Sequence, residues 1–237
     1  MKRPVRLDLT QSSGPQVTLH YTAPGSGIFS DMMLLGSSIP LNQQMLYNLS
    51  PLGRAKLVFA TMREMSLGAV WEQARHGGHY ILGVHMMQPR ARGQLSLTSA
   101  DPLAKPRLDF RYLADPFDLQ RYRHGLRLAD SVLRSDPFRE LGAKRISPTP
   151  AALDSDPALD DYIHTHLGTS IHMSGTCQMG PVADNNAVVD QHGRVHGVQG
   201  LRVADTSIMP AVVRRCPHPT AIMIGERIAA LIAASPS

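Results

Sequence analysis

The stretch His172-Met-Ser-Gly-Thr-Cys177 opens the part of the chain that decides the fold. It is followed by Asp205-Thr-Ser207 and then by His218-Pro-Thr220, which begins an apolar helix. The sequence therefore places two histidines far apart in the chain, on loops bracketed by regular elements. Because histidine exchanges protons near neutral pH, two imidazoles in this arrangement suit paired proton handling.

The same residues also admit simpler interpretations. A histidine with a satisfied structural role is more common than a catalytic one. Cys177 beside His172 is a candidate nucleophile, but no oxyanion site is visible, and a small buried cysteine is the alternative. His164 and His166 point to different sides of a helix, which argues against a metal site. Asp205 either orients a polar ligand or caps a turn.

The composition is that of an ordinary globular protein. Of 237 residues, 43% are hydrophobic and 18% are charged, enough to bury a sizeable core. The formal net charge of +5 comes from scattered arginines rather than a basic run, which argues against nucleic-acid binding. With only Cys177 and Cys216, we expect no disulfide framework and a reducing, cytoplasmic setting. We find no signal peptide and no apolar run of the ~20 residues that a membrane span needs.

Alternating apolar residues predict several short strands joined by short turns, which favours an antiparallel sheet. The expected strands cover residues 5–9, 17–21, 80–87, 93–98 and 108–110. Between the second and third of these, residues 31–65 read as short helical segments mixed with loops. The run Pro24-Gly-Ser-Gly27 reads as a turn rather than a phosphate loop, because Ser30 stands where a third glycine is required.

Helix signals follow the strands. Asp118 is expected to cap an amphipathic helix that Asp136-Pro137 ends, and a second helix runs from Asp156 to Gly168. Residues 147–153 are the best internal linker candidate. Residues 187–205 read as short strands separated by glycine turns, and the last helix begins near Pro219.

Ordered motifs in the chain resemble the C-terminal part of the glucose–methanol–choline flavin oxidoreductases. They are His172-Met-Ser-Gly-Thr-Cys-Gln-Met-Gly180, Gly197-Val-x-Gly-Leu-Arg-Val-x-Asp205-x-Ser-Ile-Met-Pro210, and Pro219-Thr-Ala-Ile-Met-Ile-Gly-Glu226. Upstream, Gln88-Pro-Arg-x-Arg-Gly93 and Tyr112-Leu-x-Asp-Pro116 resemble the same family. The likeness covers most of the chain from Tyr80 onward and, more loosely, its start.

The resemblance implies an FAD-dependent enzyme that oxidises the CH–OH group of a small-molecule alcohol, with hydride transfer to flavin N5. On this interpretation His172 is the proton acceptor and His218 is the second active-site residue. The resemblance also implies a set of residues that bind the FAD cofactor. These are Asp205, Thr206, Pro219 and Thr220.

The expected fold class is α+β. Residues 1–150 form a substrate-binding domain with an antiparallel sheet flanked by helices, and residues 151–237 return the catalytic histidines to an FAD-binding domain. The family's N-terminal Gly-x-Gly-x-x-Gly unit, which binds the ADP part of FAD, has no counterpart here. We therefore expect a truncated or split C-terminal part whose partner is an N-terminal FAD-binding chain. The alternative is a non-catalytic binding or scaffold module derived from the substrate domain.

Overall fold

The computed structural model describes residues 17–37, 80–140 and 145–234. The strand expected at 5–9 and most of the region 31–65 lie outside these ranges. The chain divides into two compact units, each made of two stretches: Met1–His85 with Arg123–Ser155, and Met86–Tyr122 with Asp156–Ser237. The assignment of residues 1–150 to a substrate-binding domain and of 151–237 to an FAD-binding domain stays a prediction.

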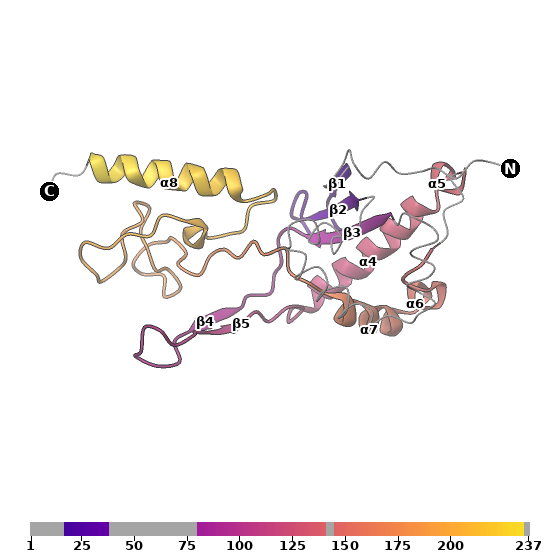
Figure 1. Ribbon diagram of the computed structural model, residues 1–237, viewed down its shortest axis with the longest axis horizontal. Helices are drawn as coiled ribbons and strands as arrows, with labels where there is room; N and C mark the ends of the chain where they lie inside the picture. Colours follow the sequence, from indigo (N-terminus) through magenta and orange to yellow (C-terminus); the bar gives the residue numbers. More distant parts are fainter. Residues whose placement is uncertain (1–16, 38–79, 141–144, 235–237) are drawn as a thin grey trace, which may run out of the picture. The chain divides into compact units, whose positions relative to one another are not determined.

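The first unit contains a three-stranded sheet in the order β1-β2-β3 (Figure 1). The strands are β1 Val17–Tyr21, β2 Met32–Ser37 and β3 Ile81–Met86. β1 and β2 are antiparallel, with Tyr21 opposite Met32. The strands expected at 17–21 and 80–87 are confirmed, whereas the helix-and-loop prediction is wrong at β2. The apolar run of β2 is too short for periodicity to separate a strand from a buried helix.

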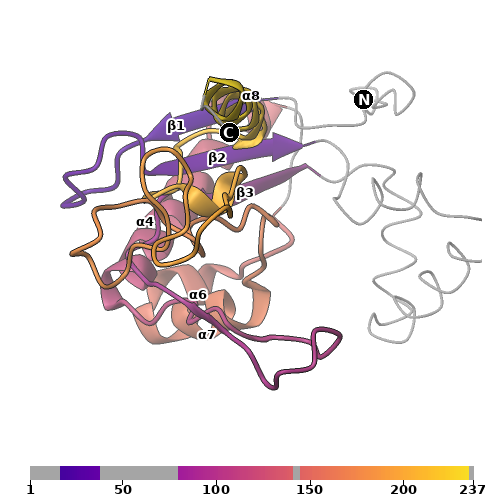
Figure 2. The ribbon, with the colours of Figure 1, turned by 90° about the vertical axis from the view of Figure 1, so that its left-hand side faces the viewer.

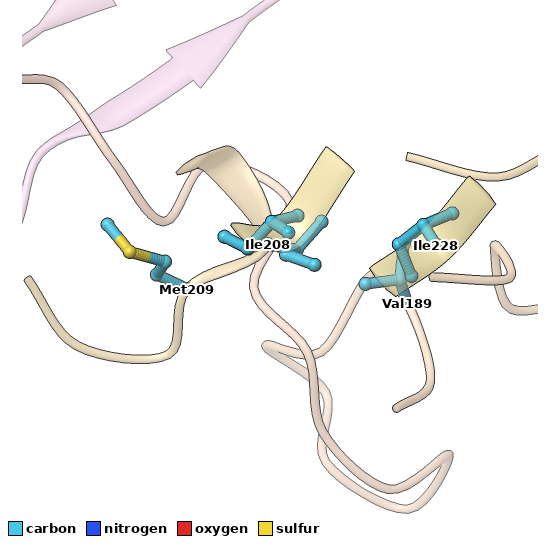
Figure 3. Close-up of a cluster of buried hydrophobic side chains, with 5 residues drawn as sticks. Val189, Ile208, Met209 and Ile228 are labelled. Atoms are coloured by element: carbon cyan, nitrogen blue, oxygen red, sulfur yellow. The ribbon is translucent and has the colours of Figure 1, made fainter. Parts of the chain in front are cut away.

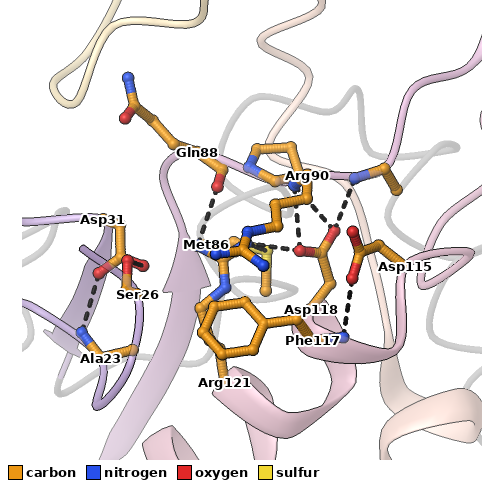
Figure 4. Close-up of polar contacts among 12 residues, drawn as sticks. Ala23, Ser26, Asp31, Met86, Gln88, Arg90, Asp115, Phe117, Asp118 and Arg121 are labelled. Atoms are coloured by element: carbon orange, nitrogen blue, oxygen red, sulfur yellow. Dashed lines mark hydrogen bonds and ion pairs between the residues drawn. The ribbon is translucent and has the colours of Figure 1, made fainter. Parts of the chain in front are cut away.

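The loop between β1 and β2 is closed by a buried carboxylate. Asp31 accepts a hydrogen bond from the N–H of Ala23 at 2.9 Å and one from the hydroxyl of Ser26 at 2.6 Å (Figure 4). Gly25 and Gly27 both adopt positive φ, at 73° and 66°, a conformation that glycine takes without strain. The turn expected at these glycines is confirmed.

The central helix α4, Pro116–Leu133, begins before its expected cap. The carboxylate of Asp115 accepts the N–H of Phe117 at 2.8 Å, as a residue preceding a helix does. Asp118 lies inside the first turn and is buried. The expectation that Asp118 caps the helix is therefore wrong, because its side chain turns inward to another loop.

Three shorter helices follow, namely α5 Asp136–Glu140, α6 Pro150–Asp154 and α7 Asp156–His166. α7 confirms the helix expected from Asp156. α6 occupies most of the expected linker 147–153, so that prediction is wrong. Thr149 caps α6 by accepting the N–H of Ala152 at 3.2 Å, and proline stands in its first turn.

The second unit includes a hairpin and a loop-rich region against the last helix. β4 Gln94–Ser96 and β5 Arg107–Asp109 pair antiparallel, with Leu95 opposite Leu108, as expected. Residues 187–205 form isolated bridges rather than the expected strands, because tight glycine turns leave too few residues between them. A 3₁₀ turn, η1 Thr206–Ile208, and the helix α8 His218–Ala233 complete the unit.

A small hydrophobic cluster joins η1, α8 and the neighbouring loop. Ile208 and Met209 meet Ile224 and Ile228 of α8, and Val189 packs beside them (Figure 3). α8 therefore lies along the loops of the region 172–209, as two orthogonal views show (Figures 1 and 2). Small antiparallel sheets with separate helices make the fold α+β, as expected. None of the helices in the described ranges combines the length and apolar character needed to cross a bilayer.

Candidate active site

The segment that follows His172 is fixed to η1 by a ladder of backbone hydrogen bonds. Gly175 donates to the carbonyl of Thr206 at 3.2 Å, Cys177 to that of Ser207 at 2.9 Å, and Met179 to that of Ile208 at 2.8 Å. Gly175 has φ of 82°, and a Cβ there would lie 3.1 Å from the carbonyl of Met209. The loop therefore approaches η1 at backbone distance, which explains the glycine in its motif.

The residue that precedes His172 has a strained backbone conformation. Ile171 has φ of 58°, a conformation that a β-branched side chain rarely adopts. Its N–H donates to the hydroxyl of Thr169 at 3.0 Å, and the hydroxyl of Ser174 donates to the carbonyl of His172 at 3.2 Å. These local bonds fix the backbone around His172, whose imidazole is exposed.

Asp205 and Thr206 lie at the start of η1. The carboxylate of Asp205 accepts the N–H of Ser207 at 2.7 Å and so caps the 3₁₀ turn, while the side chain stays exposed. The hydroxyl of Thr206 donates to the carbonyl of Met173 at 3.4 Å. The structure shows that Asp205 caps a turn, and its expected cofactor contact stays a prediction. Thr206 gives the loop of His172 a further bond to η1.

His218 is the first residue of α8. Pro217 precedes it at the N-cap position and supplies no side-chain hydrogen bond, and the first turn contains no acidic residue. His218 and Pro219 are exposed, and Thr220 is half-buried. The positive end of the helix dipole, with no side chain capping it, favours a negative or electron-rich group near this turn.

One charged side chain in the same unit has a perturbed pKa. Partial burial alone raises the pKa of Asp190, but the N–H groups of Arg194 and His192 donate to its carboxylate and hold the pKa below its ordinary value. These bonds close the turn 190–194 behind the hydrophobic cluster. Asp190 is therefore a structural carboxylate rather than a candidate acid or base.

The structure gathers the predicted site residues on adjoining segments of one compact unit. The loop of His172 is bonded to η1, and η1 packs on α8, which begins at His218. Within the described residues, no hydrogen bond joins the two imidazole rings. Their catalytic roles, and the cofactor contacts expected of Asp205, Thr206, Pro219 and Thr220, stay predictions.

Comparison with known proteins decides the family. A family model described as GMC oxidoreductase matches residues 89–225, more than half of the chain. The chain belongs to the GMC oxidoreductase family. It is 40% identical over 154 residues to a GMC-type oxidoreductase from the thcA 5′ region of Rhodococcus erythropolis, and 39% identical over 146 residues to oxygen-dependent choline dehydrogenase 1 of Chromohalobacter salexigens. These matches cover 64% and 62% of this chain.

Solved structures agree with this assignment. A fungal aryl-alcohol oxidase matches 65% of this chain with a TM-score of 0.58 and 32% identity. The pyridoxine 4-oxidase of Mesorbium loti matches 93% of this chain with a TM-score of 0.67, and at 21% identity it shows the likeness of the fold alone. The chain covers 25% and 38% of these two proteins, and 29% and 26% of the two curated relatives.

FAD is the cofactor of the GMC oxidoreductase family, so the expected cofactor is confirmed at the level of the family. The first turn of α8, which has no side-chain cap, fits a polar ring system that carries partial negative charge. No strand in the described ranges leads through a glycine-rich loop into a helix, which is the arrangement that holds a dinucleotide pyrophosphate.

The sequence did not predict a buried polar network that lies in the same compact unit of this GMC family member. Asp118 and Arg121 are each only 1% exposed and form an ion pair at 2.5 Å. The carboxylate also accepts the N–H groups of Arg90 and Ala91, at 3.0–3.1 Å, and Arg121 donates to the carbonyl of Gln88 at 2.9 Å (Figure 4). The signal for this network was the motif Gln88-Pro-Arg-x-Arg-Gly93, which the network holds against α4.

Proposed function

We propose that this chain is the catalytic-histidine part of an FAD-dependent oxidoreductase that acts on the CH–OH group of a small-molecule alcohol. The observation that supports this most is the joining of the His172 loop, η1 and α8 through one hydrogen-bond ladder and one buried cluster. The names of two relatives, a choline dehydrogenase and an aryl-alcohol oxidase, support an alcohol as the substrate class.

In this proposal His172 accepts the hydroxyl proton of the substrate, and His218 is the second imidazole of the site. Both side chains are exposed, so they are accessible to a substrate and a cofactor. Asp205, Thr206, Pro219 and Thr220 would hold FAD at η1 and at the first turn of α8. Bound FAD supplies the acceptor for the hydride that leaves the carbon atom of the alcohol.

We further propose that an FAD-binding part completes the enzyme, because the chain spans only 26–29% of its two curated relatives. That part would supply the glycine-rich loop for the pyrophosphate of FAD. Cys177 and Cys216 are both free thiols, which supports a reducing compartment such as the cytoplasm.

A chimera tests the catalytic assignment. In the R. erythropolis relative, this chain replaces the segment that it matches, and dye-linked oxidation of an alcohol panel is measured after FAD content has been determined from flavin absorbance. His172→Ala should lower kcat at least about a hundredfold with FAD retained, since a positioned general base contributes roughly 10²–10⁴-fold.

The matched control is His164→Ala, which removes an exposed imidazole from α7 and should leave kcat unchanged. A His172→Ala chimera that keeps full FAD and full turnover would refute the assignment of His172 as the proton acceptor.

A further inference from the structure

One hydrogen bond links two segments of the second unit that are remote in sequence. The side-chain amide of Gln88 donates to the carbonyl of Val212 at 2.6 Å, across 124 positions. Val212 lies in the segment 210–217, which connects the end of η1 to the first residue of α8. Any displacement of this segment therefore reaches His218 through the backbone.

The Gln88 end of this link is rigid. Its own carbonyl accepts a hydrogen bond from the Arg121 guanidinium, which the buried Asp118 carboxylate holds in place. The next residues of the loop are fixed as well, because the N–H of Arg90 donates to Asp118 and its guanidinium stacks 4.0 Å from the ring centre of Phe117. Gln88 thus presents its amide from a backbone that α4 holds (Figure 4).

The Val212 end has apolar packing on one side. Met209, just before the segment, is buried in the hydrophobic cluster, and Val213 packs partly against that cluster. Arg214, Arg215 and Cys216, the residues that lead to the helix, are exposed. A donor that fixes the carbonyl of Val212 therefore acts where the segment leaves its apolar support and turns toward His218.

We infer that Gln88 is a positioning residue, whose side-chain amide sets the backbone that delivers His218 to the start of α8. A catalytic consequence of this role rests on the proposed function, but the placement of the segment does not. The Asp118–Arg121 pair on α4 then fixes the backbone of Gln88 and, through Gln88, the position of His218.

Hydrogen exchange on the full chain tests the placement. Gln88→Leu removes the donor, and Gln88→Glu replaces it with an acceptor. In both variants, amides of the peptide 211–223 should exchange about fivefold faster, as loss of one hydrogen bond predicts. Gln88→Lys keeps a donor at similar reach and should restore slow exchange. Gln94→Leu, the same change in the exposed strand β4, is the matched control and should have no effect.

A second reading on the same proteins separates positioning from general loss of structure. The imidazole NMR signal of His218 should shift in Gln88→Leu and return in Gln88→Lys, whereas the signal of His196, bound to the carbonyl of Gly180, should stay in place. Unchanged exchange in 211–223, or faster exchange spread equally over 188–203, would overturn the inference. Hydrogen exchange and NMR do not depend on turnover. They therefore test the role of Gln88 even if the His172→Ala experiment refutes the proposed function.

Discussion

Asp190 shows how a single carboxylate can close a loop through hydrogen bonds. Its oxygen accepts the N–H groups of His192 and Arg194 at 2.8 and 2.9 Å, and the carbonyl of Asp190 accepts the N–H of Gly193 at 3.0 Å. The hydrogen bonds to the side chain favour its charged form, so its pKa is lowered in the folded state. Folding therefore gains stability from Asp190 only where the unfolded carboxyl is already ionised.

We predict that Asp190→Asn destabilises the chain at pH 7, by up to about 1 kcal/mol, because charge-assisted bonds become neutral ones. The difference between wild type and variant should persist above the ordinary aspartate pKa of 3.8 and shrink as pH falls below it. Urea unfolding at pH 7 and pH 3 measures the difference in the free energy of unfolding between wild type and variant. Asp161→Asn on α7 is the control. A difference that grows on acidification would contradict the direction of the pKa shift.

At the residue scale, the motif residues can be located from the sequence, whereas the residues to which they are hydrogen-bonded cannot. His172 and His218 stand in runs specific enough to identify, and the structure puts them on adjoining segments. The bond between Gln88 and Val212 spans 124 positions and has no local pattern. Asp118 fitted the local signal of a helix cap, but a long-range bond to the loop at Arg90 determines its orientation.

At the scale of elements, the tight turn at Gly193 sets how the loops pack on α8. Gly193 has φ of 72°, and a Cβ there would lie 2.6 Å from the carbonyl of Val203 and 3.0 Å from Cδ1 of Ile228. Gly197 has a similar φ of 75°, but a Cβ there would meet nothing within 4 Å. Substitution at the two glycines therefore distinguishes the cost of a steric clash from the cost of the backbone conformation.

We predict that Gly193→Ala destabilises the chain by roughly 3 kcal/mol, since a backbone clash adds to the cost of positive φ. Gly197→Ala should cost only about 1 kcal/mol, the cost of the conformation alone. Thermal unfolding followed by circular dichroism ranks the two variants. Equal losses in both would show that the close approach of Gly193 to α8 contributes nothing.

Elements were predictable where one local signal dominated. α7 begins with an aspartate and a proline, and α8 carries a long apolar pattern, so both helices can be predicted from the sequence. β2 was missed because its apolar run is short, and α6 because five residues near prolines look like a linker. The bridges of 187–205 were taken for strands, since glycine turns end each pairing after a residue or two.

At the scale of the whole molecule, the α+β class followed from the short turns between strands, but the composition of the two compact units did not. Each unit combines two stretches of chain, because residues 86–122 pack with the C-terminal part and residues 123–155 with the N-terminal part. Contacts between distant stretches decide this interleaving, and no single sequence window contains them. The assignment of functional domains on either side of residues 150/151 is a separate matter and stays a prediction.

The outer face of α8 leads to a prediction about the proposed FAD-binding part. Ile224 and Ile228 face the hydrophobic cluster, whereas Ile222 and Met223 on the other side are 54% and 56% exposed. A helix that is apolar on both sides is usually buried. Since the chain spans 26–29% of its two curated relatives, we expect the FAD-binding part to cover this face.

We therefore predict that Ile222→Gln with Met223→Gln leaves the stability of the isolated chain within about 0.5 kcal/mol, as surface changes do. The same double variant should weaken binding to the separately expressed FAD-binding part of the R. erythropolis relative at least about tenfold, because each side chain contributes roughly 1.5–3 kcal/mol when fully buried. Val182→Gln with Val198→Gln, at positions 80% and 50% exposed, is the matched control. Titration calorimetry with FAD present measures the dissociation constants of the α8 variant and of the control. If the α8 variant binds as tightly as wild type, another surface of the chain meets the partner, since only covered apolar side chains lose binding free energy when they become polar.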